Sequence, residues 1–155
     1  MNAEARLVKL GLELPGPTTG TSNRAGAVRS GTMIYTSGHG PAPRADGSEL
    51  RGKVGADVTL EEGYEAGRLT GFALLATIQA ELGSLDHVAR VVKLLGLVNC
   101  APGFNQTSHV VDGCSDLMIE VFGTEIGRHA RSAVGASELP LDFPVEIEAI
   151  FEVAG

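Results

Sequence analysis

The stretch ARSAVGASELPLDFPVEIEAIFEV, which spans residues 130–153, decides the fold of this chain. Within it, residues 145–153 alternate strictly between two kinds of side chain. Apolar residues occupy the odd positions, whereas Glu146, Glu148 and Glu152 occupy even positions. Because successive side chains of a strand point to opposite faces of a sheet, this pattern predicts a half-buried β-strand. The glutamate face also carries an isoleucine, so we expect that face to meet another subunit.

The first part of the same stretch predicts a second strand at residues 130–136, with small residues around Arg131. Pro140 and Pro144 lie between the two strands, and proline suits a connection because it has no N–H to donate to a sheet. We therefore expect the two strands to pair as a hairpin, with Arg131 and Glu146 close together on one face. A guanidinium beside a carboxylate can hold a small acid and a water molecule.

The clearest helix begins at Thr59. The run from Thr59 to Glu62 is a capping box, in which both side chains accept hydrogen bonds from free backbone N–H groups. The helix is expected to run to about Leu82 and to stop at Gly83. Three glycines recur at every fourth residue along it, and each costs about 1 kcal/mol relative to alanine, so a close approach to another element is expected. These glycines are Gly63, Gly67 and Gly71.

The rest of the chain predicts shorter elements. Residues 88–99 are rich in valine and leucine and favour a buried strand, with a helix as the alternative. The other expected elements are a short helix at 2–12, two strands at 25–29 and 33–37, and a helix at 107–122 that stops at Gly123. Two long helices and several strands in 155 residues suggest an α+β protein, with helices on one face of a sheet.

Composition and charge narrow the class of function. A net charge of −7 without a cluster of basic residues opposes binding to nucleic acid or to an anionic membrane. No apolar run reaches the roughly 20 residues of a membrane span, so we expect no membrane contact and a cytoplasmic location. The two cysteines, Cys100 and Cys114, do not have metal-site spacing. Cys114 lies on the apolar face of an expected helix, which favours a buried thiol.

Arg131 and Glu146 are the candidate functional side chains of the closing stretch. Small neighbours leave Arg131 unmasked, so it can clamp a carboxylate through two parallel hydrogen bonds. A surface arginine paired with a glutamate is the alternative. Glu146 can orient or deprotonate a water molecule. The solvated polar face of an edge strand is the alternative there.

The turn at residues 36–40, Thr-Ser-Gly-His-Gly, combines a hydroxyl with two glycines. Its free backbone N–H groups can hold an anionic oxygen, and a plain turn is the alternative. The four histidines match no metal motif. His39 is the best of them for a catalytic role because of the turn it occupies, while His87 and His129 adjoin charged residues and are expected to be exposed.

Three segments together resemble the RidA (YjgF) family of reactive-intermediate deaminases. They are TSGHGP at 36–41, the capped helix, and ARSAVGASELPLDFPVEIEAI at 130–150. The resemblance implies an α+β, chorismate-mutase-like fold with a mixed, mainly antiparallel sheet, two main helices on one face and an extra short N-terminal helix. It implies a single RidA-like domain over residues 1–155, with 1–24 as an N-terminal helix and loop extension and 25–153 as the core.

The resemblance also implies an activity, the hydrolysis of small 2-imino or enamine acids to 2-oxo acids and ammonia. The site would lie in clefts between the subunits of a homotrimer and need no cofactor. By position, Arg131 matches the arginine that holds the substrate carboxylate, and Glu146 matches the glutamate that positions the attacking water. Ser37 and Gly38 match residues that line the cleft, and Asp112 falls near a position usually occupied by asparagine. The three helix glycines would let their helix pack tightly on the sheet.

Two positions depart from the family pattern. A cysteine that is common two residues after the arginine is replaced by Ala133, and an aromatic residue expected some thirteen positions before Ser37 is replaced by Arg24. These departures keep a second hypothesis open, a non-catalytic trimer that binds small carboxylates or has a regulatory role. Ribonuclease activity, a third hypothesis, is disfavoured by the acidic charge and the scarcity of aromatic residues.

Overall fold

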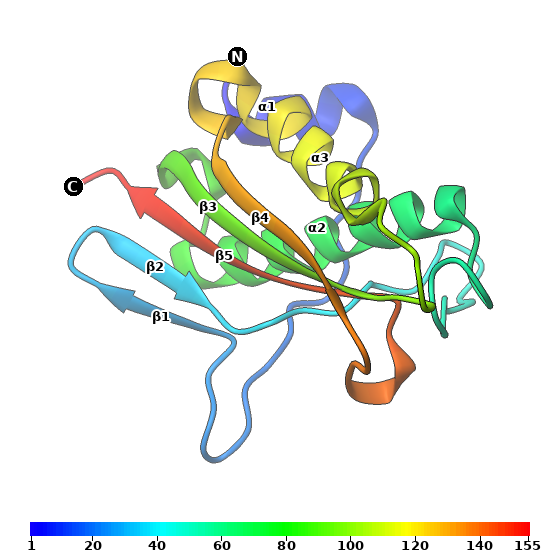
Figure 1. The fold of residues 1–155 in the computed structure, drawn as a ribbon. Coiled ribbons are helices and arrows are strands. Elements are labelled where there is room, and N and C mark those ends of the chain that lie inside the picture. The colour runs from blue at the N-terminus through cyan, green and yellow to red at the C-terminus, as the bar shows by residue number, and fades with distance from the viewer.

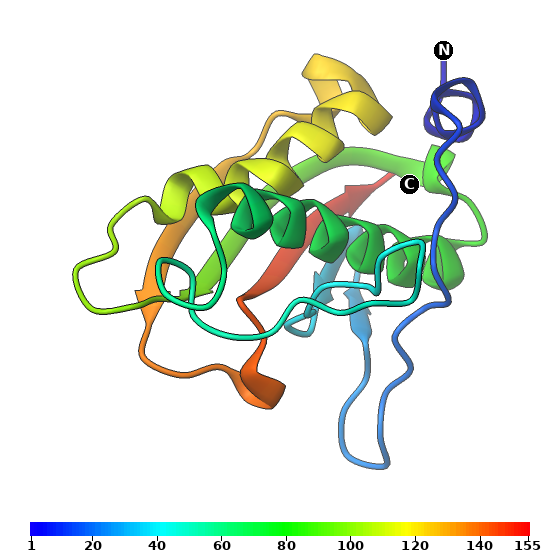
Figure 2. The same cartoon turned by 90° about the vertical axis from the view of Figure 1, so that its right-hand side faces the viewer.

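The computed structural model describes all residues from 1 to 155, which form one five-stranded sheet with two long helices across one face (Figures 1 and 2). The helices are α1 (Ala3–Leu10), α2 (Leu60–Leu82) and α3 (Thr107–Gly127). The strands are β1 (Ala27–Ser30), β2 (Met33–Thr36), β3 (Val88–Asn99), β4 (Ala130–Ala136) and β5 (Val145–Val153). Two single 3₁₀ turns complete the chain, η1 (Leu85–His87) and η2 (Pro140–Asp142). The predicted α+β layer, with helices on one face of a sheet, is confirmed.

The strands lie in the order β1-β2-β5-β3-β4, and only β3 and β4 run parallel (Figure 1). The predicted hairpin of β4 with β5 is therefore wrong, because β3 lies between them. The reason is the crossover through α3, which returns the chain beside β3 in the same direction. The proline-containing connection then carries the chain past the end of β3 to its other edge.

This topology puts Arg131 and Glu146 on opposite faces of the sheet. Leu94 of β3 pairs with both Arg131 and Ala149, and all three belong to the face covered by the helices, here called the helix face. Glu146 pairs with Leu97 on the opposite, open face. The expectation that the two charged side chains lie close together on one face of a single chain is therefore wrong.

Helix α2 confirms the predicted boundaries. Thr59 and Glu62 form the capping box, and Gly83 ends the helix with a left-handed φ of 78°. Its glycines face α3 rather than the sheet, which corrects the packing implied by the resemblance. A Cβ on Gly67 would overlap the backbone oxygen of Val110, and one on Gly113 of α3 would overlap the backbone of α2 in return. The two helices therefore approach at backbone distance.

Helix α3 differs from its predicted end. Gly123 has a φ of 80° and breaks the helix where expected, but a further helical turn follows and ends at Gly127. At its buried side, Cys114 is completely shielded from solvent, as predicted, and burial raises the pKa of its thiol to about 12. No helix of this structure is long and apolar enough to cross a membrane.

The alternating pattern of β5 is confirmed residue by residue, since its odd positions are all buried and its glutamates are not. The open face nevertheless carries large apolar side chains. Val28 is 58% exposed, Val134 47% and Tyr35 46%. These side chains surround the glutamates on an uncovered surface of the sheet.

Candidate functional site

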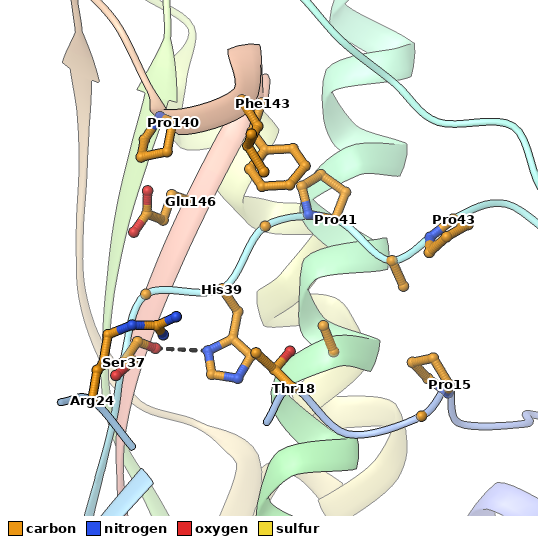
Figure 3. Close-up of a pocket in the computed structure, with 16 residues that line it drawn as sticks. Pro15, Thr18, Arg24, Ser37, His39, Pro41, Pro43, Pro140, Phe143 and Glu146 are labelled. Carbon is orange, nitrogen blue, oxygen red and sulfur yellow. Dashed lines mark hydrogen bonds between the residues drawn. The ribbon is translucent and has the colours of Figure 1, made fainter. Parts of the chain in front are cut away.

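A cavity of about 660 Å³ opens where β2 has ended and β5 begins (Figure 3). The turn after β2 supplies Ser37 and Gly38, and β5 supplies Glu146. The loop before β1 supplies Arg24, which sequence reasoning noted only as a departure from the family pattern. Four prolines and Phe143 form much of the remaining wall. Three of the predicted site residues are thus brought together, from segments more than a hundred positions apart.

Glu146 lies directly against the backbone of Gly38. A Cβ on Gly38 would overlap the carboxylate of Glu146, so only glycine leaves the present room for it. The carboxylate makes no hydrogen bond or ion pair within the chain, and no buried polar side-chain atom lacks a partner, so its oxygens face solvent in the cavity. The Gly38 N–H is also uncommitted, whereas those of Ser37 and His39 donate to backbone oxygens. A carboxylate and an N–H donor are therefore both available to a bound molecule.

Ser37 fixes the neighbouring loop. Its hydroxyl donates to the backbone oxygen of Ala25 at 2.6 Å, and its N–H donates to that of Gly26 at 2.9 Å. Since the hydroxyl hydrogen is used inside the chain, Ser37 presents only acceptor capacity to the cavity. Its main role in this geometry is to hold the segment that carries Arg24.

His39 is not available as an acid or base. Its side chain is only 2% exposed, and both ring nitrogens are occupied. Nδ1 lies 2.7 Å from the backbone oxygen of Ser37, to which it must donate, so Nε2 accepts from the hydroxyl of Thr77 at 2.8 Å. Burial is the main cause that lowers the pKa of His39, with a smaller contribution from the charge of Arg24. A neutral His39 therefore ties the turn to α2.

Arg131 lies at the start of β4 and points to α3. One of its terminal nitrogens, Nη1, donates to Asp112 Oδ1 at 2.6 Å and to Ser115 Oγ at 3.1 Å. The other, Nη2, reaches the backbone oxygen of Ser108 at 3.4 Å. The expectation that nothing masks Arg131 is corrected here, since α3 supplies these partners. The Nε atom makes no hydrogen bond and is not buried, so the guanidinium edge formed by Nε and Nη2 is open to a carboxylate.

A relay of hydrogen bonds orients the arginine from behind. His129 donates from Nδ1 to the backbone oxygen of Gly127 at 2.7 Å, so its Nε2 accepts from the Ser115 hydroxyl at 3.0 Å. Ser115 in turn accepts from Arg131. Burial lowers the pKa of His129, and the expectation that this histidine is exposed is wrong. Sequence reasoning missed Ser115 and His129 because they become neighbours only when α3 packs on β4.

In the structure, the predicted site residues thus lie in two separate groups. Ser37, Gly38 and Glu146 meet at the cavity, while Asp112 and Arg131 meet at the far edge of the sheet. Within the chain, no group of three or more His, Cys, Asp or Glu side chains is arranged to hold a metal ion.

Comparison with known proteins agrees with the architecture. Residues 4–150 match the family described as "YjgF/chorismate_mutase-like, putative endoribonuclease". The chain belongs to this family. The YjgF resemblance of the sequence is thereby confirmed, and the match extends well into the N-terminal segment.

Individual members of the family are similar over nearly the whole chain. Protein TCP17 of Trypanosoma cruzi is 42% identical over 149 residues, covering 96% of this chain and 92% of that protein. The crystal structure of Atu1372 from Agrobacterium tumefaciens, a protein of unknown function, is 37% identical with a TM-score of 0.87, covering 98% and 92% of the two chains. A structure from Shewanella oneidensis MR-1 that carries the endoribonuclease name is 32% identical with a TM-score of 0.91, covering 99% and 100%.

Proposed function

We propose that this YjgF-family protein hydrolyses small 2-imino or enamine acids to 2-oxo acids and ammonia, at clefts shared between copies of the chain. The observation that carries the proposal is the uncommitted carboxylate of Glu146, which faces a cavity large enough for a small acid and lies against the Gly38 backbone. A carboxylate in this setting can accept a proton from water.

The residues divide the reaction between them. The open edge of Arg131 holds the substrate carboxylate through parallel hydrogen bonds. Glu146 takes a proton from water as the water oxygen adds to the C=N carbon, and then passes that proton to the nitrogen. Glu146 next moves the hydroxyl proton of the resulting amino alcohol to the nitrogen, so that the C–N bond breaks, ammonia leaves and the 2-oxo acid forms. Imines hydrolyse readily, so orientation of the two reactants is the main requirement.

The separation of Arg131 and Glu146 on opposite faces of one chain supports a shared cleft. One copy would supply Arg131 and its neighbour Glu146. The exposed apolar side chains of the open face, including Val134 and Tyr35, support an assembly that covers this face. We propose a homotrimer, without a cofactor and in the cytoplasm. Gel filtration tests the assembly, and elution at the 16.0 kDa mass of one chain would contradict it.

The activity is tested by forming 2-aminoacrylate or 2-iminobutanoate in place with a dehydratase and following imine loss. Acceleration by the wild type that disappears in Arg131→Ala and in Glu146→Gln supports the deaminase. A mixture of the two variants, unfolded and refolded together, tests the shared cleft. Each mixed trimer contains one cleft with both native residues, so about a quarter of the wild-type activity returns. No recovery would mean that both residues act from one chain.

Ala133, which stands where a cysteine is common in the family, favours a second candidate, a trimer that binds small carboxylates without turnover. That function predicts binding of a 2-oxo acid, lost in Arg131→Ala, with no acceleration of imine loss. Because the family description and one relative carry the endoribonuclease name, ribonuclease activity is a third function to test. Ribonuclease activity predicts RNA cleavage that survives Arg131→Ala and falls as salt is raised.

A further inference from the structure

Arg24 is a cation in the cavity without an ion-pair partner. It lines the same space as Ser37, Gly38 and Glu146. Its guanidinium donates no hydrogen bond and forms no ion pair within the chain. Of the side chains that line the cavity, Arg24 and His39 alone are basic, and His39 is buried with both nitrogens occupied. The positive charge of the cavity wall therefore comes from Arg24.

The backbone that carries Arg24 is held firmly. Its oxygen accepts from the N–H of Thr21 at 2.6 Å, and the next two backbone oxygens accept the hydrogen bonds from Ser37. Gly20 packs so closely on this segment that a Cβ there would overlap the Arg24 oxygen. A cation on a fixed backbone can select a ligand, because little loop ordering is needed when the ligand binds.

The direction of the side chain agrees with this role. In Figure 3 the Arg24 side chain extends toward His39, on the side of the cavity that also carries Ser37 and Glu146. After burial, which is the main cause, the charge of Arg24 also contributes to lowering the pKa of His39, and Arg24 itself is exposed. Phe143 and the prolines supply apolar walls, and the exposed Arg24 is accessible to an anion that enters the cavity.

Arg131 and Arg24 differ in their neighbours. Arg131 is paired with Asp112 at 2.6 Å, whereas no acid pairs with Arg24. In the shared cleft of the proposed function, on which this inference rests, a 2-imino acid has its carboxylate on Arg131 and its C=N carbon near Glu146. Its side chain then extends into the cavity of the second copy, toward Arg24.

We infer that Arg24 binds a second acidic group, so that the preferred substrates are imines of acidic amino acids, with two carboxylates. A five-carbon dicarboxylate is small enough for a cavity of about 660 Å³. Oxidation or dehydrogenation of an acidic amino acid at its α-carbon is the class of reaction that supplies such an imine. Arg24 is a specificity-determining residue in this scheme, since it contacts the substrate away from the reacting carbon.

The test compares two imines and two arginine variants. 2-Iminoglutarate is formed in place from glutamate by an oxidase, and 2-iminobutanoate is formed by a dehydratase. The wild type is expected to have the higher kcat/KM for 2-iminoglutarate. Arg24→Gln is expected to lower that value about tenfold or more and to change the value for 2-iminobutanoate less than about twofold, because only one substrate has the second carboxylate. Arg29→Gln, an exposed arginine outside the cavity lining, serves as the matched control.

Binding gives a readout that does not depend on turnover. Calorimetry is expected to show tighter binding of 2-oxoglutarate than of 2-oxobutanoate by the wild type, with the difference lost in Arg24→Gln and kept in Arg29→Gln. Equal binding of the two acids, or an unchanged preference in Arg24→Gln, would overturn the role of Arg24 while leaving the deaminase intact. Arg24-dependent binding of 2-oxoglutarate without hydrolysis of either imine would support the role of Arg24 and overturn the deaminase.

Discussion

Arg131 and Glu146 carry opposite charges in the proposed chemistry, and the protein holds them in opposite ways. Arg131 has three partners from α3 and a relay to His129 behind them. Glu146 has no partner, and its place depends on the missing side chain of Gly38. A binding group gains from fixed orientation, whereas a base must keep its lone pairs available to water. The contrast suggests that the region around Arg131 binds the substrate carboxylate and that the region around Glu146 transfers protons.

The largest effect is expected from Glu146→Gln. The amide cannot take a proton from water, so kcat/KM for imine hydrolysis should fall about 100-fold or more. Since the Glu146 carboxylate makes no hydrogen bond or ion pair in the chain, the free energy of unfolding should change by less than about 0.5 kcal/mol. The kcat/KM and the free energy of unfolding are also measured for the control Glu148→Gln. Glu148 is an exposed glutamate on the same face, and its variant should behave as wild type. Retained activity in Glu146→Gln would remove the base from the mechanism.

A smaller effect is expected from Gly38→Ala. The added methyl group overlaps the Glu146 carboxylate, the end of a flexible side chain that can move aside. The fold should therefore survive while the water is misplaced, and kcat should fall by roughly 10- to 100-fold. Single-turnover kinetics measures the chemical step. In the Glu146→Gln background the same change should add little, and a full additional loss would show that Gly38 acts independently of Glu146.

The region around Arg131 is tested by Asp112→Asn, which removes the ion-pair partner of the arginine. Removing this negative charge leaves Arg131 less compensated, so the Kd of a 2-oxo acid should fall by about threefold at low salt. Titration calorimetry measures the Kd of the 2-oxo acid. Asp116→Asn is the matched control, because Asp116 lies on the same helix but accepts from Tyr64 instead of Arg131. An equal gain in both variants would assign the effect to net charge rather than to the ion pair.

Much of the fold is visible in the sequence where the signal is local. The capping box of Thr59 and Glu62 and the glycine at 83 involve near neighbours, and their predicted positions match the structure. Alternation in residues 145–153 likewise identifies the buried face of β5. However, the alternation of apolar and polar residues does not determine which strand pairs with which. The parallel pairing of β4 with β3 depends on the α3 crossover, which no short pattern encodes.

The same division applies to the candidate site. The segments that contain Ser37, Gly38 and Glu146 are recognisable motifs, so their residues can be proposed from sequence. Arg24 lies in a loop without periodicity, and the hydrogen bonds from Ser37 to the next two residues help to hold it at the cavity. The Asp112 partner of Arg131 is a helix residue nineteen positions earlier in the chain. Such contacts follow from packing, which becomes available only with the three-dimensional structure.

Each region also contains one histidine shielded from solvent, His39 fully and His129 in part, and the two share a direction of pH dependence. Burial is the main cause that lowers the pKa of both His39 and His129, and the nearby cations Arg24 and Arg131 lower it further. The unfolded chain therefore binds protons at these imidazoles at a higher pH than the folded chain. Proton uptake favours unfolding, so the free energy of unfolding should fall as the pH drops below about 6.5, until the folded imidazoles also become protonated.

Replacing either histidine should reduce this pH dependence, which is the smallest of the expected effects. The melting temperature is measured from about pH 7.5 to 5.0 for wild type, His39→Gln, His129→Gln and the exposed control His87→Gln. His39 and His129 have no common hydrogen-bond partner, so the reductions should add in the double variant. A double variant as acid-sensitive as the wild type would assign the acid response to other groups. Non-additive reductions would mean that the surroundings of Arg131 and the cavity are coupled through the sheet, in which β3 lies between β4 and β5.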